Sequence, residues 1–355
     1  MSGTSLDGID AVLVDFSSGE PDLLATHYRP YQAELRQALL ALNQPGHDEL
    51  HQASLLGNRL AQEYALAITA LLQSAAVVPN EVLAIGCHGQ TIRHRPDARY
   101  TLQLGNAALL AETSGITVVN DFRSRDIAAG GQGAPLVPAF HNQVLRHPGI
   151  HRVVVNIGGI SNLTDLPPQR LTTGFDCGPG NLLMDAWCMR HLKQPYDKDG
   201  KWAASGQVLP ALLKDLLQEP FLSAPPPKSS GRELFNLHWL EQHLSGNEAP
   251  VDVQATLLAL SIQAIAQAVR EHCQGAREIY LCGGGARNPT LFKQLAATLP
   301  DCVIQPTDTL GIDADWMEAI AFAWLAQQAM DGNRVDLSAV TGAHHACILG
   351  AIHQA

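Results

Sequence analysis

The first sixteen residues, MSGTSLDGIDAVLVDF (1–16), place small polar residues directly ahead of an apolar, β-branched run. The run 11–16 predicts a buried β-strand. The segment before it, SGTSLDG (2–8), holds more Gly, Ser, Thr and Asp than a tight turn needs. Gly3 and Gly8 allow positive φ, and the hydroxyl side chains add donors beside exposed amides. We interpret this segment as a turn that an anionic group approaches closely; an ordinary hairpin turn is the alternative.

Two later segments repeat this design. NIGGISN (156–162) joins two strand-like runs, and CGGGARN (282–288) lies between a strand and a helix. A single glycine turn of this kind is weak evidence, but three together favour a ligand with several phosphates, such as ATP. The sequence has no G-x-x-x-x-G-K-[ST] motif and no kinase-type H-R-D or D-F-G set, so neither a P-loop nor a protein kinase is expected.

Composition restricts the class of protein. The chain has 355 residues, enough for two domains, and a formal charge of −11, which argues against a nucleic-acid partner. Its seven cysteines are scattered without Cys-x-x-Cys spacing, which favours a reducing compartment over zinc or disulfides. The longest apolar stretches contain polar residues and read as buried helices rather than membrane spans. We expect a soluble, cytoplasmic protein that binds no membrane.

Strands alternate with helices twice along the chain, which predicts an α/β fold built of two related lobes. Helical spacing is clearest over 48–75 and 252–272. The glycine-rich segment 120–140 is interpreted as a crossing between the lobes, and the Pro-rich segment 222–235 as a linker. A last helix is expected behind Asp313 and Asp315, which could serve its N-terminus.

A carboxylate stands out in GFDCGPGNLLMDAW (174–187). Asp176 lies between small residues just before a Gly-Pro-Gly turn, so its side chain is expected to project from a strand end. The other interpretation is a helix N-cap, a role in which Asp is common. Asp185 is expected inside the following helix.

Seven segments together, in this order, resemble the 1,6-anhydro-N-acetylmuramic acid kinases of the sugar kinase, Hsp70 and actin superfamily. They are MSGTSLDGID, CHGQT, NDFRSRDIAAGGQGAPLVP, NIGGISN, FDCGPGN, PPKSSGRE and CGGGARN, and they span nearly the whole chain. The resemblance implies two similar lobes of the actin-like ATPase (ribonuclease H-like) type with an ATP cleft between them. We expect 1–134 plus 315–355 as lobe I and 135–314 as lobe II.

The resemblance also implies the activity. Such a kinase uses ATP and water to open the 1,6-anhydro bridge of 1,6-anhydro-N-acetylmuramic acid and phosphorylates O6. The products are N-acetylmuramic acid 6-phosphate and ADP, in peptidoglycan recycling. The expected partners are therefore this small amino sugar, ATP and Mg²⁺, and the family suggests a homodimer.

The site residues follow from the matching motifs. Asp176 is implied as the general base that takes the proton of the attacking water. The ATP-binding residues are Gly3, Thr4, Ser5, Leu6, Asp7, Gly8, Ile9, Asp10, Gly158, Gly159, Gly283, Gly284, Gly285 and Asn288. Asp7 and Asp10 could hold Mg²⁺ through water, because magnesium prefers a few carboxylates with retained waters and phosphates. The substrate-binding candidates are His88, Gln90, Arg123, Arg125 and Glu318.

Some of these assignments leave alternatives open. Either Arg123 or Arg125 could pair with the lactyl carboxylate of the sugar. His88 on its own is more often a structural histidine, and Glu318 could equally lie on a solvated helix face. Asp197 and Asp199 fit a surface turn better than a calcium loop, because the other ligands of such a loop are missing.

The chain as a whole also has alternatives. It could be an actin- or Hsp70-type ATPase that uses ATP as a switch, or a kinase of another sugar. A glycosidase with paired carboxylates is a third reading, but it would leave the glycine clusters unexplained.

The start of the sequence differs from the family pattern. Members usually carry several residues before the segment that matches MSGTS, and these form the strand that enters the first turn. Here the sequence begins at the turn, so either its start is misassigned or trimmed, or the first hairpin lacks its incoming strand. That loss should weaken both stability and nucleotide binding.

Overall fold

The computed structural model describes residues 1–3 and 6–355. Thr4 and Ser5, both predicted to bind ATP, lie outside the described residues. The chain forms two compact units: unit 1 is Met1–Phe140 with Glu318–Ala355, and unit 2 is His141–Met317. The chain crosses between them after residues 140 and 317, rather than after 134 and 314 as the sequence suggested. Each unit is described by itself.

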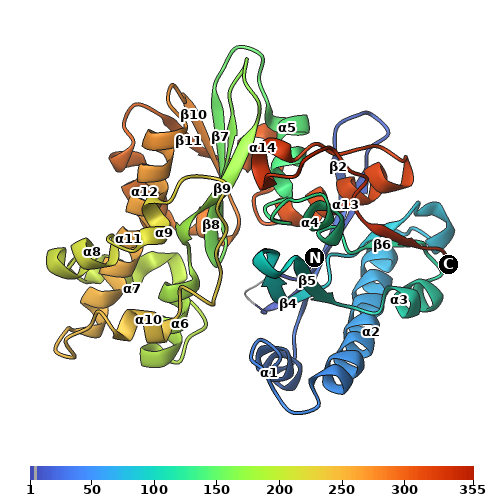
Figure 1. Cartoon of the computed structure of the whole chain (residues 1–355), viewed down its shortest axis with the longest axis horizontal. Coiled ribbons are helices and arrows are strands. Elements are labelled where there is room, and N and C mark those ends of the chain that lie inside the picture. The colour runs from blue at the N-terminus through green and yellow to red at the C-terminus, as the bar shows by residue number, and fades with distance from the viewer. Residues whose placement is uncertain (4–5) are drawn as a thin grey trace. The chain divides into compact units, whose positions relative to one another are not determined.

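Unit 2 is built on a five-stranded sheet (Figure 1). Its strands, in spatial order, are β11 (Val303–Pro306), β10 (Glu278–Cys282), β7 (Arg152–Ile157), β8 (Ile160–Leu166) and β9 (Thr173–Pro179). β7, β8 and β9 form an antiparallel meander, whereas β10 runs parallel to both β7 and β11. Only β8 therefore opposes the others, which is the ribonuclease H-like arrangement.

The helices of unit 2 cover this sheet. α11 (Pro250–His272) packs on β8 and β9, and α6 (Leu182–Leu192) and α12 (Pro289–Thr298) pack against α11. Shorter helices complete the unit: α7 (Lys201–Ser205), α8 (Pro210–Leu216), α9 (Pro220–Ser223) and α10 (Leu237–Glu241). Among the described residues, α11 alone is long and apolar enough to cross a membrane, yet 78% of its most apolar window is buried inside the protein.

Unit 1 divides its strands among smaller sheets. β1 (Gly8–Asp15) and β2 (Asp22–Pro30) form an antiparallel hairpin, as do β4 (Gln90–Arg95) and β5 (Tyr100–Leu104). β6 (Val118–Asn120) pairs with β3 (Ile85–Gly86) and β12 (Ala351–His353). The helices are α1 (Ala33–Ala41), α2 (Glu49–Ala75), α3 (Ala107–Ser114), α4 (Ser124–Ala128), α5 (Val137–Leu145), α13 (Met317–Met330) and α14 (Ser338–Thr341). α5 and α13 contain the two crossings between the units.

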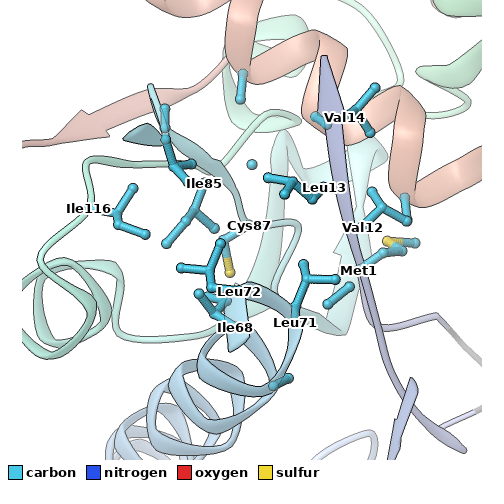
Figure 2. A pocket seen from close by; sticks show the side chains of 18 of the residues that line it. Met1, Val12, Leu13, Val14, Ile68, Leu71, Leu72, Ile85, Cys87 and Ile116 are labelled. Carbon is cyan, nitrogen blue, oxygen red and sulfur yellow. The ribbon is translucent and has the colours of Figure 1, made fainter. Parts of the chain in front are cut away.

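A cavity of about 610 Å³ lies beside β1 and β3 in unit 1. Figure 2 shows apolar side chains of β1, β3 and α2 around it, among them Val12, Ile85 and Leu71. Unit 2 has the same order of pairings: the hairpin β8–β9 matches β1–β2, and the parallel pair β10–β11 matches β3–β6. In unit 2 a strand, β7, fills the position between hairpin and pair. In unit 1 that position is the cavity.

Met1 pairs with Asp10 at the edge of this cavity, and the pairing shows that a strand in the cavity would run antiparallel to β1. The α-amine of Met1 donates to the Asp10 carbonyl at 2.6 Å, and the Asp10 N–H donates to the Met1 carbonyl at 2.8 Å. This double exchange is typical of an antiparallel pair. Burial lowers the pKa of the Met1 amine below 8.0. By strand alternation, Val12 turns its N–H and C=O to the same side as Asp10. Ile85 N–H donates to the Thr117 carbonyl, just before β6, and Cys87 N–H donates to the Val119 carbonyl of β6. The backbone N–H and C=O of Gly86 therefore point away from β6.

We predict that joining five apolar, β-branched residues to the Met1 amine raises the free energy of unfolding. The added residues would continue the antiparallel pairing along Ala11–Asp15 and bury apolar surface at about 25 cal/mol per Å². They would also replace a buried charged amine by an amide, which is cheaper to bury. Urea unfolding monitored by circular dichroism measures the difference.

The control carries five Gly and Ser residues in the same place. It has the same length and replaces the same amine but brings no apolar side chains, so its free energy of unfolding should stay below that of the apolar extension. Equal unfolding midpoints for the apolar and Gly/Ser extensions would show that the cavity does not take a strand.

Candidate functional site

The three-glycine segment packs directly against the end of β7. Gly283 has φ +75°, and a Cβ there would collide with Asn156 Oδ1. A Cβ on Gly285 would lie 2.6 Å from Ile157 Cβ, closer than real side chains come. Only glycine allows this approach of two segments that are far apart in the sequence. The second phosphate turn (156–162) and the adenosine motif (282–288), named for their predicted roles, therefore lie at the same edge of the unit 2 sheet.

The turn between β7 and β8 is fastened to the start of α6. Gly180 N–H donates to the Gly159 carbonyl at 2.9 Å, and Asn181 N–H to the Gly158 carbonyl at 2.8 Å. Asn181 Nδ2 also donates to the Ile157 carbonyl at 3.2 Å. Among the described residues, no hydrogen bond engages the N–H of Gly158 or Gly159. The turn therefore offers backbone donors, the groups that bind phosphate oxygens.

Asp176 lies on β9 with 8% of its surface exposed. Its Oδ2 accepts the Ser230 N–H at 2.9 Å, and its own N–H donates to the Lys228 carbonyl at 3.1 Å. The N-cap of α6 is Asn181, so the helix-cap interpretation of Asp176 is wrong. Asp185 lies in the first turn of α6. A buried carboxylate with a fixed oxygen is suited to take a proton.

The Pro-rich segment is not a linker. It binds Asp176 on β9 twice: the Lys228 carbonyl accepts the Asp176 N–H, and the Ser230 N–H donates to the Asp176 side chain. Lys228 is 7% exposed and donates to the carbonyls of Phe221 and Leu222. Proline and serine content suggested a flexible connection, but the lysine in the middle anchors the segment to the fold.

Asn288 acts as a helix cap in this structure. Its Oδ1 accepts the N–H groups of Thr290 and Leu291, both at 3.1 Å, at the start of α12. A ligand could still contact its Nδ2 or backbone, but the side-chain oxygen is engaged.

Asp313 and Asp315, expected to serve the last helix, bind Arg287. The ion pairs are 2.8 Å and 2.9 Å long, and Asp308 adds a third at 3.0 Å. These pairs hold the segment before α13 against the three-glycine loop, a long-range role that neighbouring residues in the sequence do not reveal.

The predicted first phosphate turn of unit 1 (2–8) is hydrogen-bonded to the CHGQT segment (87–91). Gln90 is 1% exposed, and its Nε2 donates to the Gly3 carbonyl at 3.1 Å. Asp7 Oδ1 accepts the Gly8 N–H at 3.0 Å. Leu6, in the left-handed region at φ 57°, and Ile9 bury their side chains in the core, so only their backbones could serve a ligand.

His88 and Arg123 bind each other. The His88 Nδ1 lies 2.7 Å from the Gly89 carbonyl, and Arg123 Nε donates to His88 Nε2 at 3.1 Å. Burial and the Arg123 charge hold the pKa of His88 well below 6.5. The ring is thus neutral, and it accepts from arginine rather than carrying charge. Arg123 also donates to the Gly133 carbonyl at 2.7 Å.

Arg125 differs from Arg123. It lies on α4 with an exposed side chain, and it makes no hydrogen bond or ion pair with a described residue. Asp126 beside it is buried, and it accepts from Gly133 N–H at 2.7 Å and from Thr341 Oγ1 at 2.7 Å. The loop that carries both arginines is therefore fixed, while one guanidinium faces solvent.

The acidic candidates in unit 1, Asp7, Asp10 and Glu318, act electrostatically on shared neighbours. Burial, followed by the charges of Asp7 and Asp10, raises the pKa of Tyr28 to about 12. Glu318 is half-buried at the start of α13 and acts electrostatically on the Met1 amine, so a fully solvated face is excluded. No group of three His, Cys, Asp or Glu that could hold a metal occurs among the described residues. Two carboxylates acting through water remain compatible with Mg²⁺.

The segment 197–199 forms a surface turn. Asp197 accepts the N–H groups of Trp202 and Ala203, both at 2.9 Å, and Asp199 pairs with Lys201. These carboxylates are engaged in local structure, as the sequence suggested.

Sequence reasoning gave no role to several residues that hold the site. Asn181 fixes the second phosphate turn, Ser261 Oγ donates to the Gly180 carbonyl at 2.8 Å, and Ser230 binds Asp176. The motifs GPGN and PPKSSGRE contained two of these three. Ser261 lies inside an apolar helix and left no signal.

We predict that Gly285→Ala destabilises the protein by about 1–3 kcal/mol, because its Cβ forces Ile157 to move. Gly284→Ala is the matched control: its nearest neighbour would be Asn181 Nδ2 at 4.0 Å, so it should be nearly neutral. Denaturant unfolding of both variants measures this. Equal losses would contradict the described contact.

Comparisons with known proteins agree over the full length. The family model for anhydro-N-acetylmuramic acid kinase matches residues 1–355. A protein of that name from Nitrosospira multiformis is 58% identical, covering 100% of this chain and 98% of its own length. One from Nitrosomonas europaea is 57% identical with the same coverage, and one from Chromobacterium violaceum is 52% identical over 99% and 97%.

A solved structure also matches at the level of the chain path. It is the activator of the 2-hydroxyisocaproyl-CoA dehydratase from Clostridium difficile with bound ADPNP, at 12% identity and a TM-score of 0.46. It covers 91% of this chain and 96% of its own. The assignment rests on the sequence relatives and the family model. The chain belongs to the anhydro-N-acetylmuramic acid kinase family.

Proposed function

We propose that this protein uses ATP and water to convert 1,6-anhydro-N-acetylmuramic acid into N-acetylmuramic acid 6-phosphate and ADP, in peptidoglycan recycling. Family membership over the whole chain supports this. The single observation that carries the chemistry is the Asp176 carboxylate, buried on β9 and bound by Ser230 N–H.

Asp176 is proposed as the general base. Water adds its oxygen to C1 of the sugar while Asp176 takes one of its protons. The C1–O6 bond breaks, and O6 forms a bond to the γ-phosphorus as ADP leaves. The Ser230 N–H keeps Oδ2 of Asp176 in place during the proton transfer. A base of this kind contributes typically about 10²–10⁴-fold to the rate.

The glycine segments are proposed to bind ATP. The N–H groups of Gly158 and Gly159 would donate to phosphate oxygens, and the bare backbone of Gly283–Gly285 would lie against the adenosine. The first turn, Gly3–Asp10, is proposed for the same phosphate chemistry in unit 1. Phosphoryl transfer depends mainly on such positioning and on neutralised charge.

Asp7 and Asp10 would hold Mg²⁺ through water. The ion would supply neutralisation of phosphate charge. The donor chemistry fits, since carboxylates combined with water and phosphates are what magnesium prefers.

Arg125 is proposed as the partner of the lactyl carboxylate. Arg123 is engaged with His88 and Gly133, whereas Arg125 exposes its guanidinium. His88, Gln90 and Arg123 would then hold the substrate loop in shape, and Glu318 would accept from a sugar hydroxyl.

A cytoplasmic homodimer is proposed as the working form. Seven unpaired cysteines support a reducing compartment, and the family resemblance supports the dimer. Light scattering on the purified chain gives the mass.

Incubation with ATP and anhydro-sugars tests the proposed function. ADP release that depends on 1,6-anhydro-N-acetylmuramic acid, with a 6-phosphate product, is expected. ATP hydrolysis without sugar would indicate a switch-type ATPase, and bridge opening without ATP would indicate a glycosidase. Turnover only with a different sugar would change the substrate.

We predict that Asp176→Asn lowers turnover by about 10²–10⁴-fold while ATP binding is retained, because the amide cannot take the proton. Steady-state kinetics and calorimetry of ATP binding measure the two effects. Asp215→Asn, at an exposed position of unit 2, is the control. Near-normal turnover of Asp176→Asn would remove Asp176 from the base role.

We also predict that Arg125→Ala raises the KM for the sugar by about 10- to 150-fold, the equivalent of roughly 1.5–3 kcal/mol for a charged hydrogen bond. Arg36→Ala, at an exposed site of α1, should leave KM unchanged. A sugar that lacks the lactyl carboxylate should bind both forms equally. An unchanged KM in Arg125→Ala would exclude this pairing.

A further inference from the structure

We propose that Lys228 is a positioning residue for the catalytic carboxylate, fastening the 226–232 segment so that Ser230 N–H holds Oδ2 of Asp176. This inference rests on the proposed function, since it takes Asp176 as the base. It assigns a role to a side chain outside the proposed ligand-binding residues.

The ammonium of Lys228 is unusually placed. It is buried, and its Nζ donates to the carbonyls of Phe221 at 2.9 Å and Leu222 at 2.8 Å. It also lies 4.9 Å from the ring centre of Phe221 and 5.6 Å from that of Phe175. Burying a charge is costly unless partners compensate. Two carbonyl oxygens and two ring faces stabilise the cation here.

These contacts connect three parts of unit 2. Phe221 and Leu222 belong to α9, and Phe175 precedes Asp176 on β9. A shift of the ammonium would therefore move the 226–232 segment relative to both α9 and β9. Because the Lys228 carbonyl accepts the Asp176 N–H, the same residue binds β9 through its backbone and α9 through its side chain.

The position of Lys228 also affects the Asp176 side chain, through Ser230. Ser230 follows Lys228 in the chain and donates its N–H to Asp176 Oδ2 at 2.9 Å. The position of that donor depends on the path of the chain from Lys228. A misplacement of about 1 Å at a reacting group can cost about 10²-fold in rate.

Lys228 also acts on Asp176 by its charge. Burial lowers the pKa of Lys228, and Cys177, Glu271 and Asp176 are the acidic groups that act on it. Cys177 is on β9 and Glu271 on α11. A cation near a carboxylate favours the ionised, proton-accepting form. Without it, Asp176 would take up a proton at higher pH, and the acid limb of the pH–rate profile would move upward.

The test compares Lys228→Met, which keeps the length but removes charge and donors, with Lys228→Arg, which keeps both. We expect the methionine variant to lose about 10- to 100-fold in kcat with little change in the KM of either substrate. Its acid limb should move to higher pH. The arginine variant should recover part of kcat and restore the limb. Lys214→Met, at an exposed position of α8, is the control.

A double variant separates positioning from a general loss of structure. If Lys228 acts through Asp176, adding Lys228→Met to Asp176→Asn should slow turnover no further. Independent, multiplying losses would overturn the inference, as would normal kcat and pH profile in Lys228→Met. Should Lys228→Met fail to fold, as circular dichroism would show, Lys228→Arg alone decides. A partial loss of kcat with an unchanged KM and a normal pH profile supports the inference, and a normal kcat overturns it.

Failure of the proposed function has a different signature. An original chain with no sugar-dependent ADP release would refute the function itself. An active original chain with an unaffected Lys228→Met variant would refute only the role of Lys228.

Discussion

Parallel strands whose carboxyl ends meet at one edge of the unit 2 sheet are the constraint on which the site depends. β7, β9 and β10 all run in the same direction, since only β8 is reversed. Ligands of α/β sheets bind outside such edges. The phosphate turn follows β7, Asp176 lies on β9, and the three glycines follow β10. Close contact between these segments is possible because Gly283 and Gly285 have no side chain to obstruct it.

The site combines two kinds of preparation. Bonds from the start of α6 hold the turn that carries Gly158 and Gly159, so their N–H groups need no refolding to bind the proposed phosphate. The carboxylate of Asp176 is held by a segment outside the sheet, which itself depends on a buried lysine. In unit 1, His88, Arg123 and Asp126 hold the loop that presents Arg125. The rigid residues thus support the few groups that are proposed to bind ligands.

Local patterns in the sequence predicted much of this. Periodicity predicted α2, α11 and the strand β1. The expected strand-end position of Asp176 is wrong: it lies in the middle of β9, because the strand continues through Gly178 and Pro179. Long-range partners could not be predicted, because periodicity reports only which face is buried. Composition therefore suggested a linker where Lys228 anchors the chain, and nothing local indicated that Asp313 and Asp315 bind Arg287. The choice of Arg125 over Arg123 likewise depends on His88, which is distant in sequence.

The central claim is that Asp176 directs the attacking water to C1 of the sugar, while the γ-phosphorus of ATP is attacked by O6. Turnover in ¹⁸O-labelled water, with prompt mass spectrometry of the products, tests it most directly. The account predicts one ¹⁸O at C1 of the sugar phosphate and none in the phosphate group. Label in phosphate, or an unlabelled C1, would mean that water attacks elsewhere and would contradict the account.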